Sequence, residues 1–188
     1  KIRYMAYADG DLAINDGRAG DFAWNNPPKV DDPKSYDKLK LHLAYILTIP
    51  GVPIIYYGDE IGMTGAADPD NRRMMRFGYD LDKNEIQTFE DVSKLIHIRK
   101  DHPALRYGDF LTLQADENIY AYLRSDMNER VLIIANKNSN QQNVRFTLPG
   151  MYKITKAKNL VDGKEFDVKD NKFDVNVNGI QYLILQLR

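Results

Sequence analysis

Cysteine is missing from this chain of 188 residues, so disulfide bonds and cysteine-ligated zinc are excluded. An excess of positive charge is missing too, because 26 Lys and Arg stand against 27 Asp and Glu. We therefore expect no nucleic-acid partner. No apolar run approaches the roughly 20 residues of a membrane-spanning helix, and we expect no membrane partner. These absences do not fix the compartment, which stays open between cytoplasmic and extracytoplasmic.

The composition is that of a globular protein, with 43% hydrophobic and 28% charged residues. There are twelve tyrosines, seven phenylalanines and one tryptophan. Such side chains can stack on sugars, but an ordinary core needs a similar number. Aromatic content alone therefore does not predict a carbohydrate ligand.

The most distinctive segment is GVPIIYYGDE at 51–60. Its apolar run, 52–57, predicts a short buried strand bounded by glycines. Asp59 and Glu60 follow at the carboxyl end, and the polar loop DPDNRR comes next at 68–73. Ligands of parallel α/β proteins bind at this end of the strands, so the segment predicts part of a binding site.

Helices are predicted on both sides of this strand. Residues 32–47 have apolar side chains at helical spacing, with Asp32 as the N-cap. A second helix is predicted at 89–101, where Thr88 begins a pattern similar to a capping box. Residues 1–31 are rich in Gly, Asp, Asn and Pro and predict a long loop.

From Leu105 onward the hydrophobic period changes to two, which is typical of antiparallel strands. Asn178-Gly179 lies between two such runs and predicts a hairpin. Many short strands with turn signals between them favour a Greek-key β-sandwich. The expected strands are 109–114, 118–124, 130–136, 142–148, 151–156, 164–168, 172–177 and 180–187.

These patterns divide the chain into an α/β segment at 1–103 and a β-sandwich domain at 104–188. One strand and two helices cannot close a barrel, which takes about 250 residues. The chain also begins at Lys1 rather than at a methionine. We therefore expect a piece of a longer protein, with the missing N-terminal part of a barrel as its partner.

The strings at 51–60 and 68–73 resemble the last barrel strand and the following loop of glycoside hydrolase family 13. Within this α-amylase family they are most similar to the neopullulanase and cyclomaltodextrinase group. The resemblance implies the C-terminal part of a (β/α)8 TIM barrel followed by an antiparallel Greek-key β-sandwich. It also implies a retaining hydrolase of α-glucosidic bonds in starch-derived oligosaccharides, pullulan or cyclodextrins.

Retaining enzymes of this kind use one carboxylate as nucleophile and another as acid and base. The resemblance implies that these carboxylates, and an Asn-His-Asp motif, precede the chain. The segment KIRY at 1–4 resembles the residues that follow that motif. Arg3 would support the catalytic loop, and the chain itself would contain no catalytic residue. We expect the isolated chain to be inactive.

The resemblance also implies that Asp68 and Arg72 bind the donor sugar. A carboxylate accepts hydrogen bonds from sugar hydroxyls and a guanidinium donates to them. A structural interpretation stays open, in which Asp68 caps a turn and Arg72 forms an ordinary ion pair. Asp59 and Glu60 could form a catalytic acid pair, but adjacent strand residues point to opposite faces and reach one bond only if the loop turns between them. The resemblance implies instead that both are structural.

No cofactor and no metal site are expected in this chain. The three histidines lack the spacing of metal ligands, and the acidic segment 9–21 only faintly resembles a calcium loop. Calcium in the parent enzyme stays an open alternative. Trp24 is a candidate for sugar stacking or for packing, whereas Tyr120 and Tyr122 are expected in the core.

Two rival functions remain. A transglycosylase or isomerase on the same fold would leave the same residues in this chain. A non-catalytic carbohydrate-binding module needs only the sandwich, and the buried strand at 52–57 argues against it. Homo-oligomerisation stays open.

Overall fold

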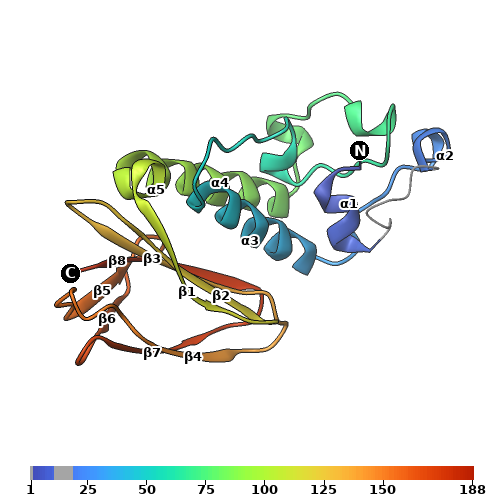
Figure 1. The fold of residues 1–188 in the computed structure, drawn as a ribbon. Coiled ribbons are helices and arrows are strands. Elements are labelled where there is room, and N and C mark those ends of the chain that lie inside the picture. Colours follow the sequence, from blue (N-terminus) through green and yellow to red (C-terminus); the bar gives the residue numbers. More distant parts are fainter. Residues whose placement is uncertain (1, 11–18) are drawn as a thin grey trace. The chain divides into compact units, whose positions relative to one another are not determined.

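The computed structural model describes residues 2–10 and 19–188, and side chains from Phe22 onward in the second range (Figure 1). Contacts divide the chain into two units. The first, here called the helical unit, comprises Lys1–His42 and Ile54–Ser93. The second, here called the sandwich unit, comprises Leu43–Pro53 and Lys94–Arg188. The boundary predicted at 103/104 stays a prediction.

The helical unit contains helices and short 3-10 turns. The prediction of a loop over 1–31 is wrong at 4–9 and 19–25, where two short helices form. These helices have six and seven residues, which is too few to show a hydrophobic period in the sequence. Gly62 has a positive φ of 76°, and a Cβ there would lie 2.7 Å from the ring of Tyr36. The elements are α1 (Tyr4–Asp9), α2 (Ala19–Asn25), α3 (Lys34–Thr48), η1 (Asp59–Ile61), η2 (Asp70–Arg72), η3 (Gly78–Asp80) and α4 (Lys83–Asp101), of which α3 and α4 also supply residues to the sandwich unit.

Helix α3 begins close to the predicted position, and the Asp32 Oδ1 atom accepts the Lys34 N–H at 2.9 Å. Helix α4 begins six residues before the predicted start. Asp82 and Glu85 form a capping box: Asp82 Oδ1 accepts the Glu85 N–H, and Glu85 Oε2 accepts the Asp82 N–H, both at 3.0 Å. The predicted cap, Thr88, instead lies inside the helix and donates to the Asn84 carbonyl.

The strand predicted at 52–57 does not form. These residues are extended but belong to no sheet among the described residues. Val52 and Ile54 are 89% and 84% exposed, and Tyr56 and Tyr57 are also exposed rather than in a core. A strand requires a hydrogen-bonded neighbour, and the described part of the chain supplies none here. Because every paired strand is antiparallel, the barrel part of the predicted fold stays a prediction.

The sandwich unit contains a six-stranded sheet, in the order β1-β2-β3-β8-β5-β6, and a two-stranded sheet, β4-β7 (Figure 1). Eight antiparallel strands were predicted and eight form, preceded by a short helix. The elements are α5 (Pro103–Tyr107), β1 (Asp109–Ala115), β2 (Ile119–Ser125), β3 (Arg130–Asn136), β4 (Gln142–Thr147), β5 (Lys156–Asn159), β6 (Glu165–Asp167), β7 (Lys172–Val177) and β8 (Gln181–Leu187).

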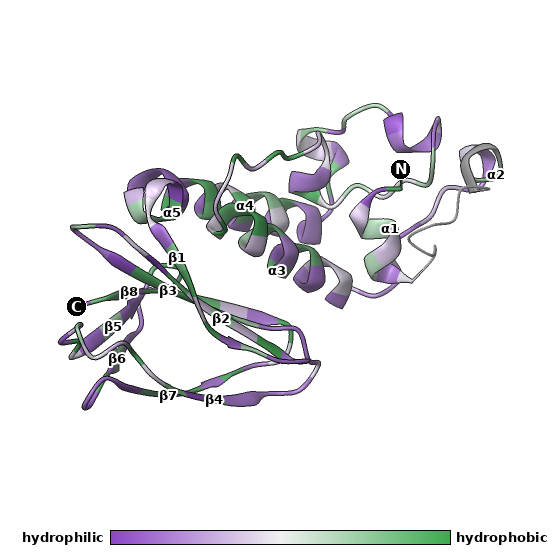
Figure 2. Ribbon diagram, viewed as in Figure 1, coloured by the Kyte–Doolittle hydropathy of each residue, from purple (hydrophilic) through white to green (hydrophobic). Residues whose placement is uncertain are grey.

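Both faces of the larger sheet are buried along its central strands β2, β3 and β8, whereas the edge strand β1 is mostly exposed. Along β2 the side chains of Ala121 and Leu123 enter the core of the sandwich, whereas Tyr122 enters a second core. That second core includes Leu47 from the end of α3 and Leu95 from α4. Buried residues therefore run almost continuously along β2 and β3. In Figure 2, by contrast, β4 is largely purple, because most of its residues are polar. The predicted core position of Tyr122 is confirmed, since it is fully buried.

Two details of the predicted strands are wrong. The strand expected at 151–156 forms instead at β5, because the Ile154 N–H donates to the Asn171 side chain and not to a strand. Asn178-Gly179 does not make a hairpin, since β7 pairs with β4 and β8 pairs with β3 and β5. The turn connects the two sheets. Gly179 is needed there because a Cβ would lie 2.0 Å from the Ser139 carbonyl oxygen.

Candidate functional site

Arg3 lies at the centre of a hydrogen-bond network in the helical unit. It is only 4% exposed. Its Nη1 atom donates to the Tyr57 carbonyl at 2.7 Å and to Asp59 Oδ1 at 3.2 Å, and its Nε atom donates to the Asn71 carbonyl at 3.1 Å. The guanidinium also lies 4.7 Å from the ring centroid of Tyr56 and 4.9 Å from that of Tyr57. Arg3 therefore joins the residues before α1 to the segment 56–59 and to the loop after Asp68.

Asp59 and Glu60 have different partners. The Asp59 carboxylate faces Arg3, whereas Glu60 Oε2 accepts the Gly58 N–H at 2.7 Å. Burial raises the pKa of Asp59, although Arg3 opposes that shift. The two carboxylates therefore do not point at one substrate bond, and both hold the turn after the extended segment.

Asp68 and Arg72 form a bidentate ion pair on the surface of the helical unit. Arg72 Nη2 lies 2.5 Å and 2.6 Å from the two Asp68 carboxylate oxygens, and Arg72 Nε lies 3.1 Å from Oδ1. Both side chains are more than half exposed, at 58% and 62%. The hydrogen bonds from Arg72 to Asp68 raise the pKa of the guanidinium. A cis Asp68–Pro69 peptide bond lies between the two residues, and their exposed side chains are accessible to a ligand.

Asp70 and Arg73, in the same loop, are structural. Asp70 is completely buried and accepts the Ala66 N–H at 2.7 Å and the Arg73 Nε–H at 2.5 Å. Arg73 Nη2 donates to the carbonyls of Trp24 and Ala23 at 2.6 Å and 3.2 Å. Its guanidinium lies 4.7 Å from the Trp24 ring centroid. One face of this tryptophan is therefore occupied by Arg73, which fastens α2 to the loop.

The structure gives two of the histidines packing or ion-pair roles. His42 stacks on Tyr4 with the ring centroids 4.2 Å apart, and burial lowers its pKa. His102 Nδ1 lies 2.7 Å from Glu129 Oε2. Over residues 2–10 and 19–188, no group of three or more His, Asp or Glu side chains is placed to hold a metal ion.

Most of the acidic segment 9–21 lies outside the described residues. Asp9, at its start, accepts the backbone N–H groups of Asp31 and Asp32 at 2.9 Å and 3.1 Å. No helix in the described part of the chain is long and apolar enough to cross a membrane.

Comparison with known proteins identifies the protein family that the sandwich unit resembles. Residues 110–184 match the family of maltogenic amylase C-terminal domains. The chain is 39% identical over 131 residues to a cyclomaltodextrinase of Geobacillus thermopakistaniensis, covering 69% of this chain and 22% of that protein. It is 32% identical over 150 residues to neopullulanase 2 of Thermoactinomyces vulgaris, covering 79% and 25%.

The described fold also occurs in a solved α-amylase from Anoxybacillus. The TM-score is 0.73 at 32% identity, over 89% of this chain and 34% of that one. The resemblance to glycoside hydrolase family 13 is therefore confirmed, and within it the chain is similar to the neopullulanase and cyclomaltodextrinase group. The chain spans about a quarter or less of the length of these two curated relatives.

Proposed function

We propose that this chain is part of a retaining α-glucan hydrolase that cleaves α-glucosidic bonds of starch-derived oligosaccharides, pullulan or cyclodextrins. The similarity to cyclomaltodextrinase and neopullulanase supports the reaction class. The observation that carries the site is the exposed Asp68–Arg72 ion pair in a loop whose sequence resembles the substrate loop of that group. The reacting carboxylates would come from parts of the parent enzyme outside this chain.

Asp68 and Arg72 would hold the donor sugar by complementary hydrogen bonds. The carboxylate oxygens of Asp68 can each accept from a sugar hydroxyl in addition to Arg72. Arg72 uses Nε and Nη2 for Asp68, so its Nη1 atom can donate to a sugar oxygen. The ion pair fixes both side chains before the ligand arrives, which reduces the conformational entropy that binding would otherwise cost.

Arg3 would position this site rather than bind the sugar directly. Its guanidinium is buried and donates to the backbone of Tyr57 and Asn71, which flank the Asp68 loop. Its Nη2 atom is buried and has no hydrogen-bond partner among the described residues. Arg3 lines a pocket of about 290 Å³ together with Tyr56 and Asp59. We propose that the preceding part of the parent barrel supplies an acceptor for Nη2 in this pocket.

Substitutions in the full-length enzyme test the sugar-binding role. Asp68→Ala and Arg72→Ala should each lower kcat/KM on a long maltooligosaccharide by roughly 10- to 150-fold, because a hydrogen bond to a charged group contributes about 1.5–3 kcal/mol. The double variant should lose less than the sum of the two, since the residues contact one another. The loss should shrink for a substrate too short to reach this donor subsite.

The sandwich unit offers a matched control. Arg145 Nε and Asp174 Oδ2 form another exposed ion pair, 2.8 Å apart, on the outer face of β4 and β7. Asp174→Ala should leave kcat/KM unchanged. Wild-type kcat/KM in both Asp68 and Arg72 variants, or unfolding of both, would show that the pair is structural.

Two further measurements address the reaction itself. The pure 188-residue chain should release no reducing sugar from pullulan, because the reacting carboxylates would lie elsewhere. Activity above a buffer blank would contradict that. The products of the full-length enzyme from a maltooligosaccharide should be shorter than the substrate, whereas longer products would indicate a transglycosylase.

A further inference from the structure

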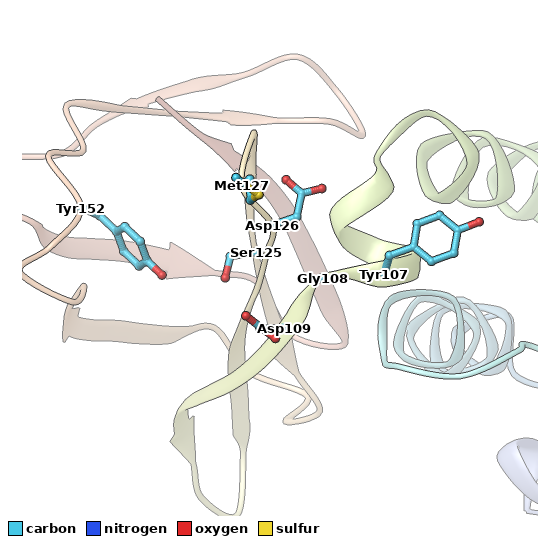
Figure 3. A pocket seen from close by; sticks show the side chains of 7 residues that line it. All are labelled: Tyr107, Gly108, Asp109, Ser125, Asp126, Met127 and Tyr152. Atoms are coloured by element: carbon cyan, nitrogen blue, oxygen red, sulfur yellow. The ribbon is translucent and has the colours of Figure 1, made fainter.

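A second pocket lies within the sandwich unit, with a volume of about 350 Å³. Three separate segments form it: the junction of α5 and β1, the end of β2 with the turn that follows, and the loop before β5. Figure 3 shows the lining side chains. They are Tyr107, Gly108, Asp109, Ser125, Asp126, Met127 and Tyr152.

The floor of this pocket is fixed by backbone packing. Asp109 and Ser125 are partners in the β1–β2 ladder. A Cβ at Gly108 would lie 2.5 Å from the Ala104 carbonyl oxygen and 2.6 Å from that of Ser125. Only glycine fits between these two backbone segments, so the pocket floor has one well-defined shape.

Two carboxylates line the pocket, and no lysine or arginine does. Asp126 Oδ1 accepts the N–H groups of Asn128 and Glu129 at 2.8 Å and 2.9 Å, which holds the β2–β3 turn. Oδ2 takes no part in these bonds and can accept from a ligand. Asp109 is exposed and can do the same.

Tyr152 provides an amphipathic wall of the pocket. The Arg130 guanidinium lies 4.5 Å from its ring centroid and covers one face of the ring. In Figure 3 the Tyr152 hydroxyl points toward Ser125, whereas the Tyr107 ring points away from the other labelled side chains. Met127 adds apolar surface that is 96% exposed. The pocket therefore combines hydrogen-bond acceptors, hydroxyl groups and apolar surface.

We infer that this pocket binds one pyranose unit of a neutral oligosaccharide, and, resting on the proposed function, that the sugar is an α-glucan. Sugar hydroxyls donate to Asp109 and Asp126, a further sugar oxygen accepts from the Tyr152 hydroxyl, and the apolar C–H face of the sugar packs against Met127. The carboxylates disfavour acidic ligands. The volume is far larger than a bare metal ion needs, and a third carboxylate or histidine ligand is missing from the described residues that line the pocket.

Titration of the 188-residue chain with maltotriose tests this inference, using calorimetry and saturation-transfer NMR. We expect weak binding, with Kd on the order of a millimolar. Asp109→Ala removes an exposed side chain and should weaken binding about tenfold or more. Tyr152→Phe keeps the ring on Arg130 and should weaken binding through the lost hydroxyl. Asp126→Asn keeps the acceptor that holds the turn and should also weaken binding.

Asp174→Ala, on the outer face of β7, is the control and should leave Kd unchanged. Weakening by Asp109→Ala and Tyr152→Phe, but not by the control, supports the pocket. Absence of binding, or stronger binding of a diamine than of maltotriose, would overturn it. Weakening by Asp68→Ala with no effect of Asp109→Ala would also overturn it, while leaving the proposed donor-sugar role intact. If instead Asp68→Ala leaves glucan cleavage unchanged and Asp109→Ala still weakens binding, the pocket stands and the donor-sugar role fails.

Discussion

Arg99 and Arg124 donate to the same buried acceptor, the carbonyl oxygen of Leu105, at 2.8 Å and 2.9 Å. Arg124 is 1% exposed and Arg99 is 8% exposed. Burial lowers the pKa of both guanidinium groups, and repulsion from Arg106 adds to the shift of Arg99, whereas repulsion from Arg99 adds to that of Arg124. Their remaining hydrogen bonds go to the carbonyls of Leu47, Thr48, Ile49, Gly51, Gly108 and Asp109.

Several of these carbonyls lie at and just after the end of α3, a helix with no basic residue in its last turn. The last carbonyls of a helix have no partner within the helix and carry partial negative charge. Arg99 and Arg124 therefore act as the missing C-terminal cations. This arrangement satisfies the buried carbonyls of Leu47, Thr48 and Leu105.

Arg124→Met should destabilise the sandwich unit by about 3–5 kcal/mol, because buried carbonyls would lose a charged donor. Arg124→Lys should recover only part of that loss, since an ammonium group cannot reproduce the planar fork. The free energy of unfolding in urea measures both. Arg145→Met, at a side chain that is 73% exposed, is the control and should change stability by less than about 0.5 kcal/mol. If Arg124→Met lowers the free energy of unfolding by less than about 1 kcal/mol, water or a shifted backbone must replace the hydrogen bonds of the guanidinium group.

Glu85 should be critical for the start of α4. Its side chain accepts the Asp82 N–H and also forms an ion pair with Arg76. Glu85→Ala removes both interactions and should cost about 1–3 kcal/mol. Glu85→Gln can still accept the Asp82 N–H and should cost less.

Hydrogen exchange of the amides at 83–88 reports this effect locally. The exposed Glu90, on the same helix, is the matched control, and Glu90→Ala should leave these amides protected as in the wild type. Equal protection in Glu85→Ala and Glu90→Ala would mean that packing of the helix, rather than the capping box, determines its first turn.

Asp116 should give the sandwich unit part of its acid sensitivity. Gln114 Nε2 donates to the Asp116 carboxylate at 2.6 Å, and the N–H groups of Asn118 and Ile119 donate at 2.8 Å. These hydrogen bonds lower the pKa of Asp116. A lowered pKa contributes stability above the ordinary value of about 4, and that stability is lost as the pH falls through the lowered value.

Asp116→Asn keeps an acceptor for the turn but removes the charge. The free energy of unfolding of this variant should lie below that of the wild type at pH 7 by less than about 1 kcal/mol, because the site is exposed. The difference should shrink as the pH falls below about 4. Glu117→Gln, in the same turn, controls for a general effect of charge. If the difference in unfolding free energy between the wild type and Asp116→Asn does not change with pH, the charge of Asp116 contributes nothing and turn geometry alone explains the difference.

The sandwich was predictable from the sequence because its signals are local. Period-two patterns located β3 and β7 at their observed bounds. The Asp-Gly pair at 162–163, a local turn signal of the sequence, lies between the paired strands β5 and β6. The strand pairing is not local. Asn178-Gly179 has the composition of a hairpin turn, but the sequence does not show that Ser139 packs against Gly179 and that the chain passes between sheets there.

The buried arginines were missed for a similar reason. In the run IYAYLRS, Arg124 alternates with apolar residues and is typical of a solvent-facing position. Its acceptors lie on α3 and α5, which no spacing within the strand can indicate. Asp68 and Arg72 were found because both lie in one short loop, whereas the partners of Arg3 are 54 to 68 residues away.

The extended segment 52–57 should exchange its amide hydrogens fastest among the ordered apolar segments of this chain. Val52 and Ile54 are almost fully exposed, and no described strand pairs with this segment. Strand β3 is the internal reference, since it is hydrogen-bonded to β2 and β8 and buried on both faces. Exchange protection follows hydrogen bonding and burial, so we expect near-complete exchange at 52–57 while β3 stays protected.

Mass spectrometry of peptides after a short deuterium pulse, at several protein concentrations, measures this difference. An exposed apolar segment that is paired with no strand is a template for pairing with another chain. Protection at 52–57 that rises with concentration would therefore show association with a second copy through this segment. Protection equal to that of β3 at every concentration would contradict the prediction, because it would require a hydrogen-bonded neighbour from within the chain itself.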